Sequence, residues 1–488
     1  MATRRWISNW EPNNADFWES QGRSIARRNL GFSILAEFLG FSVWGLWSIV
    51  AARLNLVGFH FSIGQVFWLV GLPVLVGSLL RIPYGAAVPI FGGRNWTIVS
   101  ALLLLVPTGL LAVLVQHPHT PFWLMAGAAA TAGLGGGNFA SSMSNISYFY
   151  PDDRKGWALG MNAAGGNIGV AVVQFVVPAA IGAGMLGLIL ASALKKAAAA
   201  SVKHHSSVGK ELLAQGFHLH LENAALIWIP LIIAAATCAF LFMDNLSVAR
   251  SSLREQATAL QRGHTWVMSV LYVGTFGSFI GYSAAFPTLI SSQFPLVNFL
   301  QFAFLGPLLG SIARPFGGWL SDRIGGTVVT VWNFVAMAGA AVGVVLVLNG
   351  HNPRTNPASF GLFLAMFLVL FITSGIGNGS TYRMIPALFL GDRVKAAADK
   401  GTAAMQEADR VGRKEAAAAI SLISAVGALG GFFIPIGFAQ SISATRGVAF
   451  AMLSFVGFYL LCVAMTYAFY IRTGHEAAVE ARRVAVAA

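Results

Sequence analysis

The sequence predicts an all-α membrane protein with twelve transmembrane helices in two similar six-helix halves. Three observations support this class. First, the 488 residues are 56% hydrophobic and only 10% charged, which lies outside the usual range of soluble globular proteins. Second, apolar segments of about 20 residues, the length that crosses a bilayer as a helix, recur along the chain. Third, two glycine-rich patterns each occur twice, in the same order.

The apolar segments predict the spans in chain order. They cover residues 31–53, 64–90, 96–116, 122–146, 157–191, 226–243, 266–290, 297–320, 327–349, 358–389, 414–440 and 446–471. We expect six-helix bundles at 31–243 and 266–471, joined by a cytoplasmic linker at 244–265. The other expected segments are a cytoplasmic N-terminal segment at 1–30, a long external loop at about 192–223 and a cytoplasmic tail at 472–488.

The positive charges predict the orientation. When both termini are placed in the cytoplasm, most of the 31 lysine and arginine residues fall in cytoplasmic segments, as the positive-inside rule requires. The first 30 residues are polar, so we expect no cleavable signal peptide. A multi-pass membrane protein with both termini in the cytoplasm is predicted. The net charge of +13 then follows from topology, and no nucleic-acid partner is expected.

Other functional classes find little support in the sequence. Cys238 and Cys462 fall in expected spans as small packing residues, so no disulfide framework, metal site or cofactor is expected. The histidines of the long loop, such as His204 and His205, match no strong metal-ligand spacing, which favours a solvated loop. No nucleophile, base and acid set appears among the apolar segments, so the protein is not predicted to be an enzyme.

A repeated arginine motif indicates the chemistry. Gly77-Ser78-x-x-Arg81 returns 233 residues later as Gly310-Ser311-x-x-Arg314, in each case inside an apolar span. A cation there costs about 3 kcal/mol even on the lenient insertion scale, so an intramembrane arginine is a functional candidate by default. Two matched guanidinium groups inside a membrane predict a bound anion.

The second repeat and its surroundings carry a family resemblance. Thr131-x-Gly133-x-Gly135-x-Gly137 returns as Thr373-x-Gly375-x-Gly377-x-Gly379, so the order of spans is preserved between the halves. Parallel six-helix repeats of this kind resemble the major facilitator transporters. Two segments of this chain resemble the two nitrate signatures of one family of these transporters, the NarK-type nitrate/nitrite porters. They are residues 158–169, with Gly165-Gly166-Asn167-Ile168-Gly169, and residues 424–433. The resemblance covers residues 28 to 470.

This resemblance implies a set of substrate-binding residues around the arginines. The implied set is Arg81, Arg314, Asn167, Tyr272, Phe139, Phe276 and Phe41. The phenyl rings would cover the faces of a planar anion, while Tyr272 and Asn167 would donate hydrogen bonds. Tyr272 and Phe276 are four residues apart and share a helix face, which supports them as a pair. For Asn167, a hydrogen bond to a neighbouring helix stays open as the structural alternative.

The signature glycines have a structural interpretation. Small residues at this spacing let helices pack closely and slide, and they are Gly165, Gly166, Gly169, Gly427, Gly430 and Gly431. Relative to the family pattern, Ala163 and Ser421 replace glycine, so helix approach there is expected to differ.

Glu37 leaves the mechanism open. It lies four residues before Phe41, on the same helix face, and could carry a proton or serve as a structural residue. Arg383, near the cytoplasmic end of its span, is expected at a gate or a helix end. The resemblance as a whole implies a monomeric nitrate/nitrite antiporter in the lipid bilayer of the bacterial inner membrane, serving nitrate assimilation or respiration. Nitrate/H⁺ symport through Glu37 and a nitrate-binding receptor without turnover are the alternatives.

Overall fold

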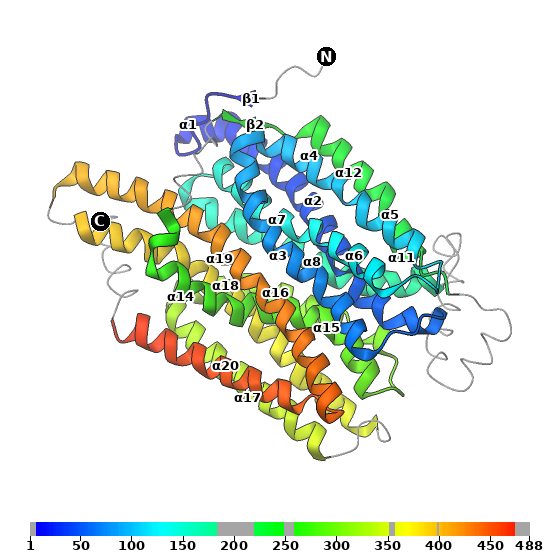
Figure 1. Cartoon of the computed structure of the whole chain (residues 1–488). Coiled ribbons are helices and arrows are strands. Elements are labelled where there is room, and N and C mark those ends of the chain that lie inside the picture. The colour runs from blue at the N-terminus through cyan, green and yellow to red at the C-terminus, as the bar shows by residue number, and fades with distance from the viewer. Residues whose placement is uncertain (1–5, 183–218, 248–257, 351–356, 398–399, 474–488) are drawn as a thin grey trace.

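The computed structural model describes residues 6–182, 219–247, 258–350, 357–397 and 400–473. Nearly all of them are helical, and Figure 1 shows long helices running side by side between two ends of the molecule. The all-α prediction is confirmed. We call the end that carries the segment Trp6–Gly22 the proximal end, and the end that carries the turns at 58–62 and 294–304 the distal end.

The described part of the first half contains six helical passages. They are α2 (Arg23–Val50) with η2 (Ala51–Val57), α3 (Ile63–Phe91), α4 (Gly93–Leu103) with α5 (Leu105–Leu114), α6 (Phe122–Thr131) with α7 (Gly133–Phe149), α8 (Asp152–Gly182), and α11 (Asn223–Leu226) with α12 (Ile229–Phe242). The short elements β1 (Trp6–Ile7), α1 (Ala15–Phe17) and η1 (Trp18–Gly22) precede them.

The residues that the structure describes in the second half also form six helical passages. After β2 (Asn245–Leu246) and η4 (Thr258–Gln261), they are α14 (Gly263–Tyr272) with η5 (Val273–Gly277) and α15 (Ser278–Gln293), η6 (Phe299–Gln301) with α16 (Leu305–Ile324), α17 (Gly326–Gly350), η7 (Pro357–Ser359) with α18 (Phe360–Ala397), α19 (Thr402–Thr445), and α20 (Ala449–Thr466) with η8 (Tyr467–Ile471). The predicted bundle boundaries stay predictions. Parts of the expected loop at 192–223 and linker at 244–265 lie outside the described residues.

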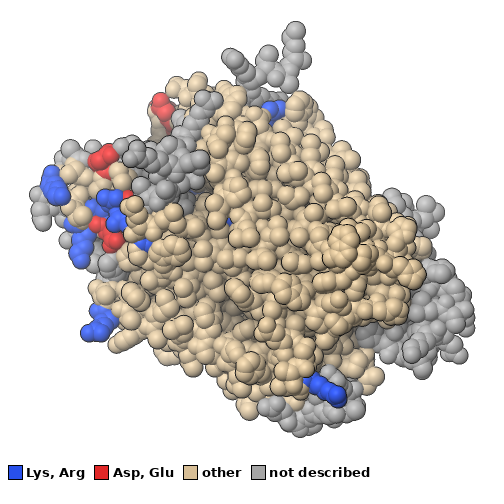
Figure 2. Space-filling view, in the orientation of Figure 1, with Lys and Arg blue, Asp and Glu red and all other residues tan. Residues whose placement is uncertain are grey.

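Eleven helical runs in the described part of the chain are long and apolar enough to cross a membrane. The fourth expected span, formed by α6 and α7, is not among them. Its α7 part is rich in glycine, serine and asparagine, and most of these residues are buried inside the bundle. Figure 2 shows charged side chains gathered at the proximal end, over α18 and α19, and a broad uncharged face between the ends. Large apolar side chains such as Trp123 (72% exposed) and Trp332 (69%) lie on the outside, as expected of a surface that faces lipid.

The two repeated motifs pack against each other in both halves. A Cβ atom added to Gly133 of α7 would lie 2.6 Å from the backbone nitrogen of Gly77 on α3. The equivalent atom on Gly375 of α18 would lie 2.2 Å from the carbonyl oxygen of Gly310 on α16. Glycine is therefore required where each arginine helix meets its neighbour, and the duplication preserves a backbone contact as well as an arginine.

Helices of opposite halves also pack against each other. α3 packs on α19, α8 on α16, and α2 on α15. The arginine helices α3 and α16 therefore both take part in contacts between the halves. This places Arg81 and Arg314 in the middle of the molecule.

A two-stranded parallel ladder at the proximal end departs from the all-α expectation. Trp6 and Ile7 pair with Asn245 and Leu246, which follow α12. Asn245 also accepts a hydrogen bond from the backbone nitrogen of Arg94 at 2.9 Å and so caps the start of α4. The ladder forms because the segments before the first span and after the sixth both lie at this end.

Candidate functional site

Arg81 is fully buried on α3 and reaches both halves of the molecule. Its Nε donates to the carbonyl oxygen of Gly136 on α7 at 3.3 Å. Its Nη1 donates to the carbonyl oxygen of Ser424 on α19, in the other half, at 3.0 Å. Its Nη2 has no hydrogen-bond partner among the described residues. One terminal nitrogen is therefore available to a ligand.

Aromatic rings cover the Arg81 guanidinium. Its Cζ lies 4.5 Å from the ring centroid of Phe139 and 4.6 Å from that of Phe276. The two phenyl rings are stacked on each other, with centroids 5.7 Å apart. Phe139 comes from α7 and Phe276 from η5, so the pair joins the two halves. These predicted residues are brought together around the arginine.

Arg314 approaches the same phenyl ring from α16. It is 4% exposed, and its Cζ lies 5.5 Å from the centroid of Phe139 and 5.5 Å from that of Tyr382. Its Nη2 donates to the hydroxyl of Tyr272 over a long 3.5 Å, while its Nη1 has no hydrogen-bond partner in the described part of the chain. The matched arginines thus share one aromatic wall, and each keeps a donor free.

The outer aromatic layer differs in part from the expected set. Tyr272 stacks on Phe276 with centroids 5.3 Å apart, as their spacing predicts. Phe41 lies behind Phe139, with centroids 6.2 Å apart, while Trp44 is 5.8 Å from the Arg81 Cζ. Trp44 and Tyr382 have no role in the sequence prediction. Only the packing of their helices against α3 and α16 puts them beside the arginines.

Asn167 is buried on α8, with 1% exposure. Neither atom of its amide has a hydrogen-bond partner among the residues that the structure describes. The structural alternative, a bond to a neighbouring helix, is therefore not observed in this conformation. A buried amide without partners is costly, so its donor and acceptor remain available to a ligand.

Glu37 is held within the first half and forms no ion pair with Arg81 or Arg314 in the described structure. Its Oε2 accepts hydrogen bonds from the hydroxyl of Ser142 on α7 and from Nδ2 of Asn162 on α8, the latter at 2.6 Å. Its Oε1 has no hydrogen-bond partner in the same region. These contacts connect α2, which carries Glu37, to two further helices of the same half, α7 and α8.

The signature glycines lie next to functional candidates. A Cβ atom on Gly166 would be 2.5 Å from Oε1 of Glu37, and one on Gly427 would be 2.4 Å from the ring of Tyr272. The remaining members also sit at close helix contacts, against side chains or backbone of the facing helix: Gly165, Gly169, Gly430 and Gly431. The first signature therefore packs α8 on α2, and the second packs α19 on the run from α14 to α15. Their expected role in close helix packing agrees with this geometry.

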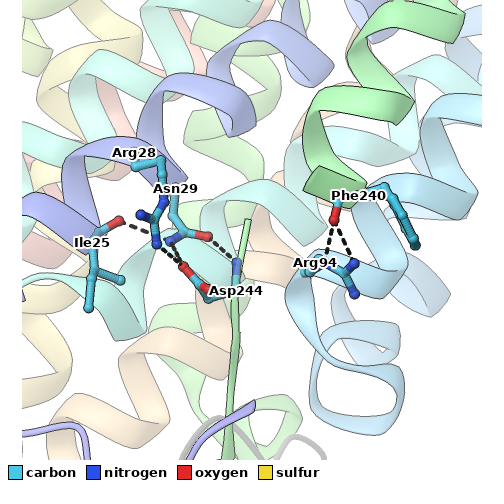
Figure 3. Close-up of polar contacts among 6 residues, drawn as sticks. All are labelled: Ile25, Arg28, Asn29, Arg94, Phe240 and Asp244. Carbon is cyan, nitrogen blue, oxygen red and sulfur yellow. Dashed lines mark hydrogen bonds and ion pairs between the residues drawn. The ribbon is translucent and has the colours of Figure 1, made fainter. Parts of the chain in front are cut away.

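Ion pairs and hydrogen bonds hold the proximal end together. In the first half, Arg28 pairs with Asp244 at 2.6 Å (Figure 3). Nε and Nη2 of Arg94 both donate to the carbonyl oxygen of Phe240 on α12. In the second half, Arg383 of α18 pairs with Asp322 in the last turn of α16. This position agrees with a gate or helix-end role for Arg383.

A further cluster centres on Glu415 of α19. Its carboxylate pairs with Arg262 at 2.9 Å and with Arg393 of α18. The Glu415 side chain is only 8% exposed. Glu415 thus links its own helix, α19, to α18 and to Arg262, which stands just before α14.

The fold and the buried arginine pair define a class of membrane transporter. The chain matches the model of the Major Facilitator Superfamily over residues 32–406, and it belongs to that superfamily. Its fold is also similar to a bacterial homologue of the human lysosomal transporter Spinster, in an inward-facing and unoccupied conformation. That match has a TM-score of 0.60 at 15% identity and covers 92% of this chain and 97% of the other.

Sequence comparison narrows the family. The chain is 42% identical over 470 residues to the nitrate/nitrite transporter NarU of Escherichia coli K12, covering 96% of this chain and 97% of that protein. It is 33% identical over 475 residues to the probable nitrate/nitrite antiporter NarK2 of Thermus thermophilus, covering 96% and 98%. Within the superfamily, the chain is a NarK-type nitrate/nitrite porter, as its motifs predict.

Proposed function

We propose that this protein exchanges nitrate and nitrite across the bacterial inner membrane by alternating access, taking nitrate in and releasing nitrite. One observation carries the proposal. Arg81 and Arg314, from opposite halves, are buried against the same ring of Phe139, and each keeps one terminal nitrogen free. The relatives' names, nitrate/nitrite transporter and antiporter, support these two anions as substrates.

The site suits a small planar oxyanion. Guanidinium groups offer charge-assisted hydrogen bonds in one plane, and nitrate accepts them in its own plane. The stacked rings of Phe139 and Phe276 form an apolar wall that excludes water and so strengthens each polar contact. In this proposal Tyr272 and Asn167 add hydrogen bonds, and Phe41 supports the wall from behind. Since each half contributes one arginine, the anion can stay bound while the halves rock around it.

The charge of the site supports exchange over uniport. Without an anion, two guanidinium groups lie close together in apolar surroundings, so closing the empty site is unfavourable. A carrier that closes only when loaded must return with an internal anion. One-for-one exchange also avoids the electrical cost of moving nitrate inward, about 2.3 kcal/mol per 100 mV for each net charge.

Nitrate/H⁺ symport is the second candidate, and the environment of Glu37 favours it. The carboxyl group is fully buried, has one unpaired oxygen and forms no ion pair with either arginine in the described structure. Such a group can bind a proton without breaking an ion pair. The hydrogen bonds from Ser142 and Asn162 support the structural alternative, because they give the carboxyl group a fixed place between three helices.

Proteoliposomes distinguish these candidates. Uptake of labelled nitrate is measured into vesicles preloaded with nitrite or left empty, each with and without an inward proton gradient. Exchange predicts uptake that requires internal nitrite, does not depend on the proton gradient and persists in Glu37→Gln. Proton-driven uptake into empty vesicles that disappears in Glu37→Gln would instead establish symport. Saturable binding without any flux would indicate a receptor.

A further inference from the structure

A third buried arginine lies at the distal end, away from the central site. Arg53 belongs to η2, the 3-10 extension of α2, and its side chain is 0% exposed. It is twelve residues beyond Phe41, which is about 18 Å along a helix axis. It is the last residue of the first expected span, 31–53, and the proposed mechanism gives it no role.

Arg53 lies where the two halves meet. Its Cζ is 4.8 Å from the ring centroid of Phe299. Phe299 opens η6, which precedes α16 in the second half, whereas η2 follows α2 in the first half. η2 also packs against α15 of the second half. The guanidinium is therefore enclosed at the distal contact between the halves.

The described residues offer the guanidinium of Arg53 no hydrogen-bond partner. None of Nε, Nη1 and Nη2 has a partner among the described residues, and no ion pair of the described chain includes Arg53. By comparison, Arg81 uses two of its three nitrogens and Arg314 uses one. Arg53 is thus the least satisfied of these three buried arginines.

The local chemistry repeats that of the central site. At both places the Cζ atom of a guanidinium lies over a phenyl ring, 4.8 Å from the ring centroid for Arg53 and 4.5 Å for Arg81. The N–H donors of a guanidinium all lie in its plane, where they suit the in-plane oxygens of a small oxyanion. A buried charge with unpaired donors is costly, and a monovalent anion would both neutralise it and accept its hydrogen bonds. Because the side chain is fully enclosed, this chemistry fits a small free anion and not a bulky lipid headgroup.

We propose that Arg53 and Phe299 form a second, distal subsite for a small monovalent oxyanion on its way between the distal surface and the central site. The identity of the anion as nitrate or nitrite rests on the proposed function. In this arrangement the anion binds first at the distal end, and the subsite raises its local concentration before it reaches Arg81 and Arg314.

Transport from each face of the membrane provides the first test. Right-side-out and inverted vesicles report the half-saturation concentration for nitrate at the two faces. Arg53→Gln should raise this half-saturation concentration roughly tenfold at the membrane face where the distal end lies. A tenfold ratio corresponds to about 1.4 kcal/mol of lost binding free energy. At the other face it should stay within about twofold. Arg53→Lys, which keeps the charge without the planar fork, should restore part of the loss. The matched control is Arg446→Gln, an exposed arginine at the same end, which should change neither value.

Thermal stability provides the second test, which does not depend on transport. The purified Arg81→Gln/Arg314→Gln protein has its central site disabled. Nitrate should still raise its melting temperature, by about 2 °C relative to gluconate at equal ionic strength. Adding Arg53→Gln should abolish that increase. In the absence of nitrate, adding Arg53→Met to the Arg81→Gln/Arg314→Gln protein should raise its melting temperature, because the change removes an uncompensated buried charge.

The outcomes separate the inference from the proposed function. An unchanged half-saturation concentration at both faces, an equal rise at both, or a nitrate effect on melting that survives Arg53→Gln would overturn the distal subsite. Absence of nitrate flux in the wild-type protein would overturn the proposed function. The melting test would still decide whether Arg53 binds a small anion.

Discussion

Replacing Arg81 by lysine would keep the positive charge at the centre of the bundle and remove the planar fork. In the structure, the fork donates to the carbonyl oxygens of Gly136 at 3.3 Å and Ser424 at 3.0 Å, and its third nitrogen is free. A lysine ammonium has its donors on one nitrogen at the end of a flexible chain. It cannot hold both carbonyl groups and also present a donor to the anion in the same plane.

The size of the effect follows from the lost contacts. One charge-assisted hydrogen bond contributes about 1.5–3 kcal/mol, and stacking of the guanidinium on Phe139 and Phe276 contributes about 0.5–2 kcal/mol. Lysine recovers part of both contributions. A net loss of about 3 kcal/mol corresponds to a fall of roughly 100-fold in kcat/KM for transport.

The assay is labelled nitrate uptake into proteoliposomes preloaded with nitrite. Arg323→Lys is the matched control, because Arg323 is exposed at the proximal end with its Cζ 4.2 Å from the Trp319 ring. We expect it to transport like the wild type. If Arg81→Lys kept more than about a third of the wild-type kcat/KM, charge alone would be sufficient and the argument from planar geometry would be refuted.

Three further changes test other parts of the structure. Gly375→Ala should lower stability by about 1–3 kcal/mol, because the new methyl group meets the backbone of Gly310, whereas Gly339→Ala, which has open space, should leave the melting temperature unchanged or raise it slightly. Tyr272→Phe should raise the half-saturation concentration for nitrate less than about fivefold, since the bond it removes is long; a loss as large as that of Arg81→Lys would contradict this geometry. Glu415→Gln should lower the free energy of unfolding by about 1–3 kcal/mol in thermal melts, because two arginines lose their acid, and an unchanged melt would show that the cluster adds no stability.

The local composition of the sequence was enough to predict the fold class. The number and order of the spans follow from the length and apolar character of each segment, which is a local property. Polar groups within a span weaken that signal, as α6 and α7 show. The two-stranded ladder of Trp6–Ile7 with Asn245–Leu246 was not predictable, because its segments are far apart in sequence and carry no strand pattern.

Part of the candidate site could also be predicted from the sequence. Arg81 and Arg314 are conspicuous because a cation in an apolar span is costly and because the motif is duplicated. The remaining expected residues came from resemblance to known porters. Among them, Phe139, Phe276 and Tyr272 lie at the arginines, Phe41 lies one layer behind, and Asn167 is buried with its amide unpaired.

Which side chains meet across helices was decided by the tertiary structure alone. The bond from Arg81 to Ser424 joins residues 343 positions apart, and the hydrogen bonds of Glu37 reach two other helices. Helical periodicity tells which residues share a face of one helix, but it carries no information on which helix packs against that face. For the same reason, the sequence placed Arg53 only at the end of the first expected span and could not show that packing of the halves encloses it against Phe299.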